Sequence, residues 1–139
     1  MIVVLDTNVV LQALNPRNDH APIMDAWFAG RFVWAVSTGI LMEYREVIVR
    51  QSGFSRWKNF DRVLHLAASV RGNLLQVSPS FHFRTIAADQ DDDKFADCAI
   101  TAQAEWIVTE DGHFNTLIGS GFKTQPIKPN EFIAQVLKL

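Results

Sequence analysis

Apolar residues along this chain gather in short continuous runs that predict buried strands. The first run, IVVL at 2–5, ends at an aspartate, as is typical of a strand that is covered on both faces. Comparable runs predict further strands, the last of them weak: FVWAV at 32–36, LLQVS at 74–78, WIVT at 106–109 and a segment near 123–128. Such strands are characteristic of a parallel sheet.

Between these runs, apolar residues recur at helical spacing. The pattern predicts helices over 8–14, about 20–30, about 38–53, 56–70, about 93–104, a short stretch after 112 and a final segment from 130. Ser37 or Thr38 can cap the third of these helices, Ser55 can cap the fourth, and Asn130 is expected to open the last. Gly72 is expected at the C′ position that ends the fourth helix.

The alternation of strands and helices predicts an α/β fold. Right-handed crossovers then give a mainly parallel central sheet with helices on both faces. A chain of 139 residues has the length of one compact domain, so we interpret 1–139 as a single domain. Sites in such folds lie at the carboxyl ends of strands. Asp6 follows the first predicted strand, and Asp111 follows the fourth.

Composition and charge narrow the function classes only slightly. Hydrophobic residues make up 48% of the chain and charged residues 20%, which favours a packed core over disorder. A net charge of −2 argues against a passive nucleic-acid coat, but not against a nuclease whose cation offsets carboxylates. No apolar run is long enough to cross a bilayer, and the first residues lack a basic signal-peptide start. The single cysteine, Cys98, excludes an internal disulfide and favours a cytoplasmic location.

Two aspartates have an ordinary structural interpretation beside a functional one. Asp6 can be the N-cap of the helix that follows it, or a metal ligand on rigid backbone that Thr7 and Asn8 support. Asp111 precedes Gly112, a common turn signal, which taken alone favours a turn residue. Neither local sequence decides between the two interpretations.

The helix predicted over 38–53 carries two glutamates. Glu43 projects from the edge of its apolar face, where a carboxylate needs a partner because burying an unpaired charge is costly. Glu46 has Arg50 four residues further on, which makes an ordinary solvent-facing pair. Glu43 is therefore the candidate site residue, and Glu46 is expected outside the cleft.

An acidic run, DQDDD at 89–93, precedes the helix predicted over 93–104. Most of this run fits the preference of helix N-termini for negative charge. Asp97 differs because it lies inside the helix among small and apolar neighbours. Asp93 is four residues before it on the same face, and this like-charge pair has a small cost. Lys94 would relieve the repulsion partly, and a divalent cation would relieve it better.

The candidate carboxylates fall on elements that can converge at one edge of a doubly wound sheet. We therefore expect a single cleft lined by Asp6, Glu43, Asp97 and Asp111. Carboxylates without clustered His or Cys favour Mg²⁺ or Mn²⁺ over zinc. Because converging carboxylates repel one another, at least one of them is expected to have a raised pKa when no cation is bound.

The first half of the chain resembles the PIN domain, in particular the small bacterial and archaeal toxins of type II toxin–antitoxin pairs. VVLDTNVVL is similar to the opening strand and acidic motif of that family. This match gives Asp6 the role of first ligand and Asn8 a supporting role. VSTGILMEYREVI resembles the second motif, with its glutamate at Glu43.

The resemblance continues through DDDKFADCAITAQAEWIVTEDGHF, so it covers nearly the whole chain. The helix carboxylate of the third motif matches Asp97. The Thr-x-Asp of the fourth motif matches Thr109 and Asp111. His113 departs from the pattern, because many relatives carry a second aspartate there. By the same resemblance, Asp93 or Lys94 is a further residue that reaches the site.

The resemblance implies a three-layer α/β/α sandwich and an endoribonuclease that hydrolyses RNA phosphodiester bonds with Mg²⁺ or Mn²⁺. The ligands implied are Asp6, Glu43, Asp97 and Asp111. It also implies a small antitoxin that covers the site, and a homodimer formed through helices away from the cleft.

Two alternatives use the same residues differently. A phosphatase of the haloacid-dehalogenase type would use Asp6 as nucleophile, but it needs an aspartate two residues further on, where this chain has Asn8. A degenerate PIN-like module would bind RNA or assemble with partners without cleaving. Loss of a carboxylate would support that alternative, and all four are present.

Overall fold

Five parallel strands form the centre of the protein in a computed structural model, which describes residues 1–80, 82–83 and 93–139. The strands are β1 (Ile2–Leu5), β2 (Val33–Val36), β3 (Leu74–Gln76), β4 (Trp106–Val108) and β5 (Gln125–Ile127). Their order in the sheet is β3-β2-β1-β4-β5, and every neighbouring pair is parallel. The predicted parallel sheet is thus confirmed, with β3 shorter than the pattern indicates.

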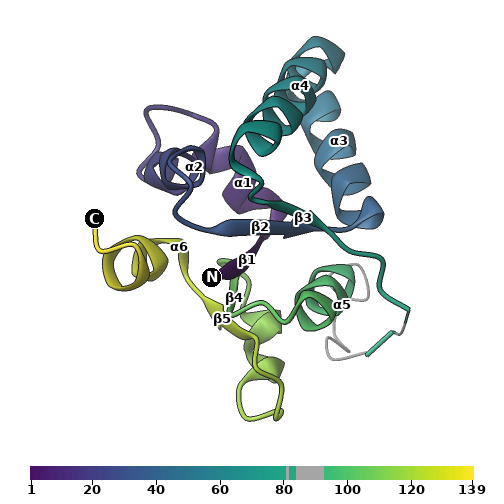
Figure 1. The fold of residues 1–139 in the computed structure, drawn as a ribbon, viewed down its shortest axis with the longest axis vertical. Helices are drawn as coiled ribbons and strands as arrows, with labels where there is room; N and C mark the ends of the chain where they lie inside the picture. The colour runs from purple at the N-terminus through teal and green to yellow at the C-terminus, as the bar shows by residue number, and fades with distance from the viewer. Residues whose placement is uncertain (81, 84–92) are drawn as a thin grey trace.

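Helices cover both faces of this sheet (Figure 1). On one side lie α1 (Thr7–Ala13), α2 (Ala21–Phe28), α3 (Thr38–Ser52) and α4 (Phe54–Arg71). On the other lie α5 (Asp93–Ala102) and the 3₁₀ helix η1 (Gly112–Leu117). The last helix, α6 (Pro129–Glu131), continues into the π-helical turn η2 (Phe132–Val136) and lies away from α5, with Phe132 against Phe32. The α/β/α sandwich is confirmed. Within the described part of the chain, no helix has the length and apolarity that a membrane span needs.

Buried side chains on both faces of β1 explain why its sequence is continuously apolar. Val3, Val4 and Leu5 are fully buried. Burial of this kind stabilises the fold by about 25 cal/mol for each Å² of apolar surface removed from water. The hydroxyl of Tyr44 in α3 donates a hydrogen bond of 2.5 Å to the carbonyl of Leu5. This bond ties α3 to the carboxyl end of β1, directly before Asp6.

The boundaries of α3 and α4 confirm two predictions, the cap at the start of α3 and the glycine that ends α4. The Ser37 hydroxyl caps α3 by accepting a hydrogen bond of 3.3 Å from the backbone N–H of Ile40. Gly72 ends α4 in the left-handed conformation, with φ of 66°, which costs glycine little because it lacks Cβ. Both residues lie just outside the helix that they delimit.

Two predicted caps are wrong. α4 begins at Phe54 rather than after Ser55, because Gly53 has a φ of 91° and joins α3 to α4 without a longer loop. The last helix begins at Pro129 rather than at Asn130. Proline favours the first helical position, where its missing N–H removes no hydrogen bond.

The topology places a switch point at the carboxyl ends of β1 and β4. These two strands are neighbours, with Leu5 paired with Val108. The chain leaves β1 toward α1 on one face and leaves β4 toward η1 on the other (Figure 1). Ligands of open α/β sheets bind in the crevice at such a point. Asp6 and Asp111 both follow these strand ends.

Candidate active site

Asp6 is fixed by donors from two adjoining elements. Its backbone N–H donates to the carbonyl of Val108 at 3.0 Å, so the residue continues the β1–β4 pairing. Its carboxylate accepts a hydrogen bond of 2.8 Å from the N–H of Thr7 and one of 2.7 Å from the hydroxyl of Thr109. The side chain is 9% exposed. Asp6 therefore caps α1 and faces the switch point at once, so its two interpretations are compatible.

Burial raises the pKa of Asp6 above its ordinary value of 3.8. The hydrogen bonds from Thr109 and Thr7 lower this pKa, whereas the charges of Glu43 and Asp111 raise it further. This raised pKa agrees with the expectation that at least one of the converging carboxylates is harder to ionise. Its main cause is loss of solvent, and repulsion between the carboxylates contributes less.

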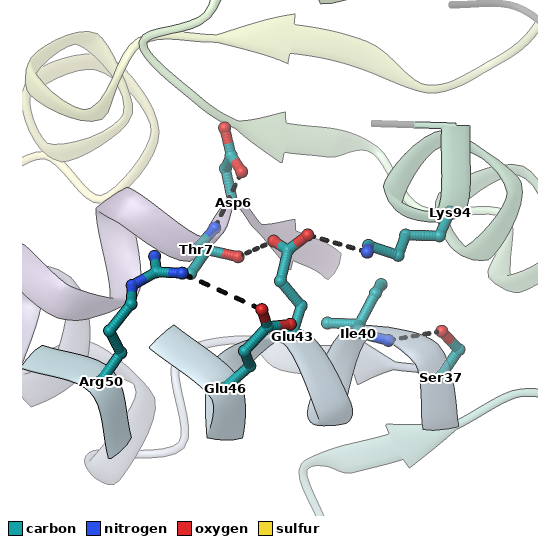
Figure 2. A network of polar contacts seen from close by, with 8 residues as sticks. All are labelled: Asp6, Thr7, Ser37, Ile40, Glu43, Glu46, Arg50 and Lys94. Atoms are coloured by element: carbon teal, nitrogen blue, oxygen red, sulfur yellow. Dashed lines mark hydrogen bonds and ion pairs between the residues drawn. The ribbon is translucent and has the colours of Figure 1, made fainter. Parts of the chain in front are cut away.

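Glu43 of α3 lies beside Asp6 with both of its oxygens engaged (Figure 2). One oxygen accepts a hydrogen bond from the hydroxyl of Thr7. The other is 2.8 Å from the ammonium of Lys94, at the start of α5. The Glu43 side chain is 22% exposed. A partner for this half-buried carboxylate was expected, but the sequence did not identify which residue it would be.

Glu46, one turn further along α3, is on the surface as predicted. Its side chain is 73% exposed and lies 3.9 Å from Arg50 (Figure 2). Exposed pairs of this kind contribute about 0–1 kcal/mol, so Glu46 is a suitable control for changes in the site.

Asp111 is joined to Asp6 through Thr109. The Thr109 hydroxyl donates to Asp6 and accepts from the backbone N–H of Asp111 at 2.9 Å. The Asp111 carboxylate accepts from the N–H of His113 at 2.9 Å and lies 3.3 Å from the His113 ring. Asp111 thus caps η1, as the turn interpretation requires, while it also lines the pocket described next.

Three of the candidate carboxylates line one pocket of about 490 Å³: Asp6, Glu43 and Asp111. Asn8, which the sequence assigned a supporting role, is also on its lining. So are Glu110 and Arg50, which the sequence did not assign to the site.

Sequence signals for these two additional residues existed. Glu110 directly precedes Asp111, and Arg50 is seven residues after Glu43 on the same helix. Residues separated by seven positions lie on one helical face.

Asp97 lies in an adjoining pocket. This pocket, of about 280 Å³, is lined by Asp97, Asp93 and Lys94 together with the first turn of α3. The residue Asp97 is 3% exposed, and its carboxylate accepts a hydrogen bond of 2.9 Å from the N–H of Phe83. Its other oxygen is 3.3 Å from the ring of His82. Asp97 therefore lies beside the pocket of the other three carboxylates, and the Lys94–Glu43 pair stands between them. Most of the acidic run, 89–92, lies outside the described residues.

Among the described residues that line the two pockets, the titratable side chains able to bind a metal ion are carboxylates, together with His82, and a set rich in carboxylates fits a hard divalent cation. Among residues 1–80, 82–83 and 93–139, however, no three His, Cys, Asp or Glu side chains are grouped closely enough to hold a metal ion. Glu43 is engaged by Thr7 and Lys94, and Asp97 by Phe83. These contacts use part of the acceptor capacity of each carboxylate and leave lone pairs on its oxygens for a metal ion.

Comparison with known families identifies the class of protein. The PIN domain family matches residues 2–113, so the chain belongs to this family. PIN domains are typically nucleases, and they generally use divalent metal ions.

Two solved structures share the fold. One is VapBC2 from Rickettsia felis bound to a DNA fragment from their promoter, with 19% identity, a TM-score of 0.60, and coverage of 91% of this chain and 98% of that chain. The other is FitAB bound to the IR36 DNA fragment, with 16% identity, a TM-score of 0.60, and coverage of 91% and 94%. Comparison with curated proteins gives no significant match.

Proposed function

We propose that this PIN domain is a Mg²⁺- or Mn²⁺-dependent endoribonuclease that hydrolyses RNA phosphodiester bonds. The observation that carries the proposal is the pocket lined by Asp6, Glu43 and Asp111 at the switch point of the sheet. Burial and neighbouring charges make ionisation of Asp6 unfavourable there, and a bound cation would reverse this penalty. The family supports the proposal, because PIN domains are typically nucleases.

We assign the metal ligands to the carboxylates of both pockets: Asp6, Glu43, Asp97 and Asp111. When bound, the cation supplies charge neutralisation at the scissile phosphate and acidifies a water for attack. The chain's own contribution is orientation. Thr109 holds the Asp6 carboxylate and the backbone of Asp111 with one hydroxyl. Asn8 and Asp93 have supporting roles at the edges of the two pockets.

Electrostatics also explains why RNA requires the cation. A phosphodiester entering the pocket brings negative charge toward three carboxylates, which repel it. Arg50 on the pocket lining offsets only part of this charge and is itself paired with Glu46. We therefore expect both RNA binding in the pocket and RNA cleavage to depend on the divalent ion.

Asp6→Asn tests the proposal because it removes the charge and keeps the side-chain size. We expect cleavage of a mixed RNA pool in Mn²⁺ to fall about a hundredfold or more. The metal-free variant should be as stable as the parent or more stable, because the buried charge is gone. Mn²⁺ at a hundred times its dissociation constant should stabilise the parent by about 2.7 kcal/mol and the variant by less.

Glu46→Gln is the matched control, since it removes an exposed carboxylate one helical turn from Glu43. It should cleave like the parent, and EDTA should abolish cleavage by both proteins. Undiminished cleavage by Asp6→Asn, or cleavage that EDTA does not affect, would refute the metal–carboxylate proposal. A parent that binds RNA but cleaves nothing with any metal would support the degenerate PIN-like module instead.

We also propose that the protein is the toxin of a toxin–antitoxin pair and that its partner is a small antitoxin. The likeness to VapBC2 and FitAB, which are toxin–antitoxin complexes, supports this. A groove of about 700 Å³, lined by apolar residues such as Leu11, Met24 and Phe60, offers a surface that such a partner needs. It adjoins the acidic pocket across α3, where Ile48 lines the groove and Val47 lines the pocket.

A homodimer formed through helices away from the acidic pocket completes this proposal. Analytical ultracentrifugation at tens of micromolar protein should give the mass of two chains. A sedimentation coefficient that stays at the monomer value throughout would contradict the dimer. Repression of cleavage by a co-expressed small protein encoded beside the gene would support the antitoxin. The absence of a gene for such a protein at that place would count against the toxin–antitoxin pair.

A further inference from the structure

Lys94 makes an ion pair that links the two pockets. Its ammonium is 2.8 Å from one oxygen of Glu43, whose other oxygen accepts from the Thr7 hydroxyl (Figure 2). The pair is partly buried, with Lys94 32% and Glu43 22% exposed. The nearby pair of Arg50 and Glu46 is longer, at 3.9 Å, and much more exposed. Lys94 is thus the close counter-charge of Glu43, and partial burial strengthens the attraction.

Packing fixes the path of the Lys94 side chain. The next two residues of α5, Phe95 and Ala96, are fully buried, so the start of the helix is anchored against the core. The stem of Lys94 then passes over the first turn of α3 at Gly39. A Cβ added to Gly39 would lie 3.8 Å from the Cδ of Lys94, which is an ordinary van der Waals distance. The ammonium therefore reaches Glu43 from a fixed starting point.

The charges around Lys94 show what its ammonium does. On one side, Glu43 shares its pocket with Asp6 and Asp111. On the other side, Lys94 shares a pocket with Asp93 and Asp97. A cation at this position reduces the repulsion within both groups of carboxylates, which is also the effect of a divalent metal ion.

We propose that Lys94 is a positioning residue that holds Glu43 when no metal is bound, and that it competes with the divalent cation for this carboxylate. The inference rests on the proposed metal-dependent function. A divalent ion held by Glu43 would lie close to the Lys94 ammonium, and repulsion between the two cations would oppose the ion or move Lys94 away from the carboxylate. Lys94 thereby lowers the affinity for metal and keeps the metal-free site ordered.

The test is Lys94→Gln, with Mn²⁺ binding to the full chain measured by titration calorimetry without RNA. We expect the dissociation constant to fall about tenfold, because both the competing charge and its repulsion are removed. The metal-free melting temperature should fall, since Glu43 loses its counter-ion. Lys94→Met, which keeps an apolar stem, should tighten Mn²⁺ binding similarly, and Lys94→Arg should bind like the parent.

Lys123→Gln is the matched control. It breaks another lysine–glutamate pair, 3.1 Å long, in which Glu105 also accepts from the N–H of Ile2. Ile2 begins β1, so this pair lies at the opposite end of the strand from Asp6. The change removes the same charge from the chain, and Mn²⁺ affinity should stay at the parent value.

The direction of the change separates competition from a merely structural role. If Lys94 only ordered the contact between α3 and α5, its loss would loosen Glu43 and weaken Mn²⁺ binding. Unchanged or weaker binding by Lys94→Gln, beside a parent that binds Mn²⁺, would overturn this inference alone. A parent that binds no Mn²⁺ would overturn the proposed metal-dependent function, and the competition with it.

Discussion

Asp6 and Asp97 are both buried carboxylates near the carboxyl edge of the sheet, yet they are held in different ways. The donors to Asp6 are Thr7, which begins α1, and Thr109, which directly follows β4. The main donor to Asp97 is the N–H of Phe83, which belongs to no helix or strand. Hydrogen bonds of the sheet therefore fix the surroundings of Asp6, whereas those of Asp97 depend on a connecting segment.

The two regions also differ in how negative charge is offset. Asp6 shares its pocket with Glu43, Glu110 and Asp111, and among the described residues Arg50 is the only basic one on that lining. Asp97 shares its pocket with Lys94, at its edge toward Glu43. Under the proposed function, a bound cation is therefore expected to matter most at Asp6.

The largest effect that separates the two regions is expected from Asp97→Asn. The asparagine oxygen can still accept from the N–H of Phe83, so the local structure should remain and stability should change by less than about 1 kcal/mol. The charge of a proposed ligand is lost, so cleavage in Mn²⁺ should fall about a hundredfold or more. Initial cleavage rates and a urea unfolding curve on the same preparation measure both quantities.

Asp93→Asn provides the comparison on the same helix, one turn before Asp97. Because Asp93 has only a supporting role, its effect on cleavage should be clearly smaller than that of Asp97→Asn. Full cleavage by Asp97→Asn would mean that Asp97 anchors the Phe83 segment and is not a ligand. The site would then consist of Asp6, Glu43 and Asp111 alone.

The same contrast explains how much of the site the sequence could predict. Asp6, Thr109 and Asp111 follow buried parallel strands, and the order of such strands determines where their ends meet. Glu43 could be separated from Glu46 because one borders the apolar face of α3 and the other does not. These predictions depend on local pattern and on sheet topology, which the sequence specifies well.

Contacts between helices were beyond such reasoning. The pairing of Lys94 with Glu43 depends on how α5 packs against α3, and so does the position of Asp97 relative to Asp6. These two helices are far apart in the sequence. Periodicity gives the face of a helix but not the rotation of one helix against another. The start of α4 was misplaced for a related reason, because Gly53 makes a direct turn that a capping rule does not anticipate.

A smaller effect is expected from pH, and it concerns Asp6. Its pKa in the folded protein is raised above 3.8, so the folded state retains a proton that the unfolded state loses. The stability that this proton gives is complete below pH 3.8 and is lost as the pH rises through the raised pKa. In EDTA, Asp6→Asn should therefore gain stability relative to the parent across this window, and the difference should level off above it.

Urea unfolding at closely spaced pH values, with and without Mn²⁺, measures this difference. The ion binds the ionised carboxylate, so it should cancel or reverse the advantage of the variant at neutral pH. Glu46→Gln should track the parent at every pH, because its exposed carboxylate gains little from the folded state. A constant difference between Asp6→Asn and the parent would show that burial does not shift the ionisation of Asp6.

The smallest effect is expected at the rim of the acidic pocket, from Arg50→Gln. Arg50 lines the pocket and is paired only loosely with Glu46, so its guanidinium is available to contact an RNA phosphate there. Loss of one phosphate contact should weaken binding of single-stranded RNA and reduce the slope of log K against log salt by about 0.7. Fluorescence anisotropy of a labelled RNA, in Ca²⁺ over a range of salt, measures both. Arg45→Gln removes the same charge from α3, but Arg45 lies over the ring of Phe54 instead. It should leave the slope unchanged, and equal slopes for both variants would exclude Arg50 from the path of the RNA.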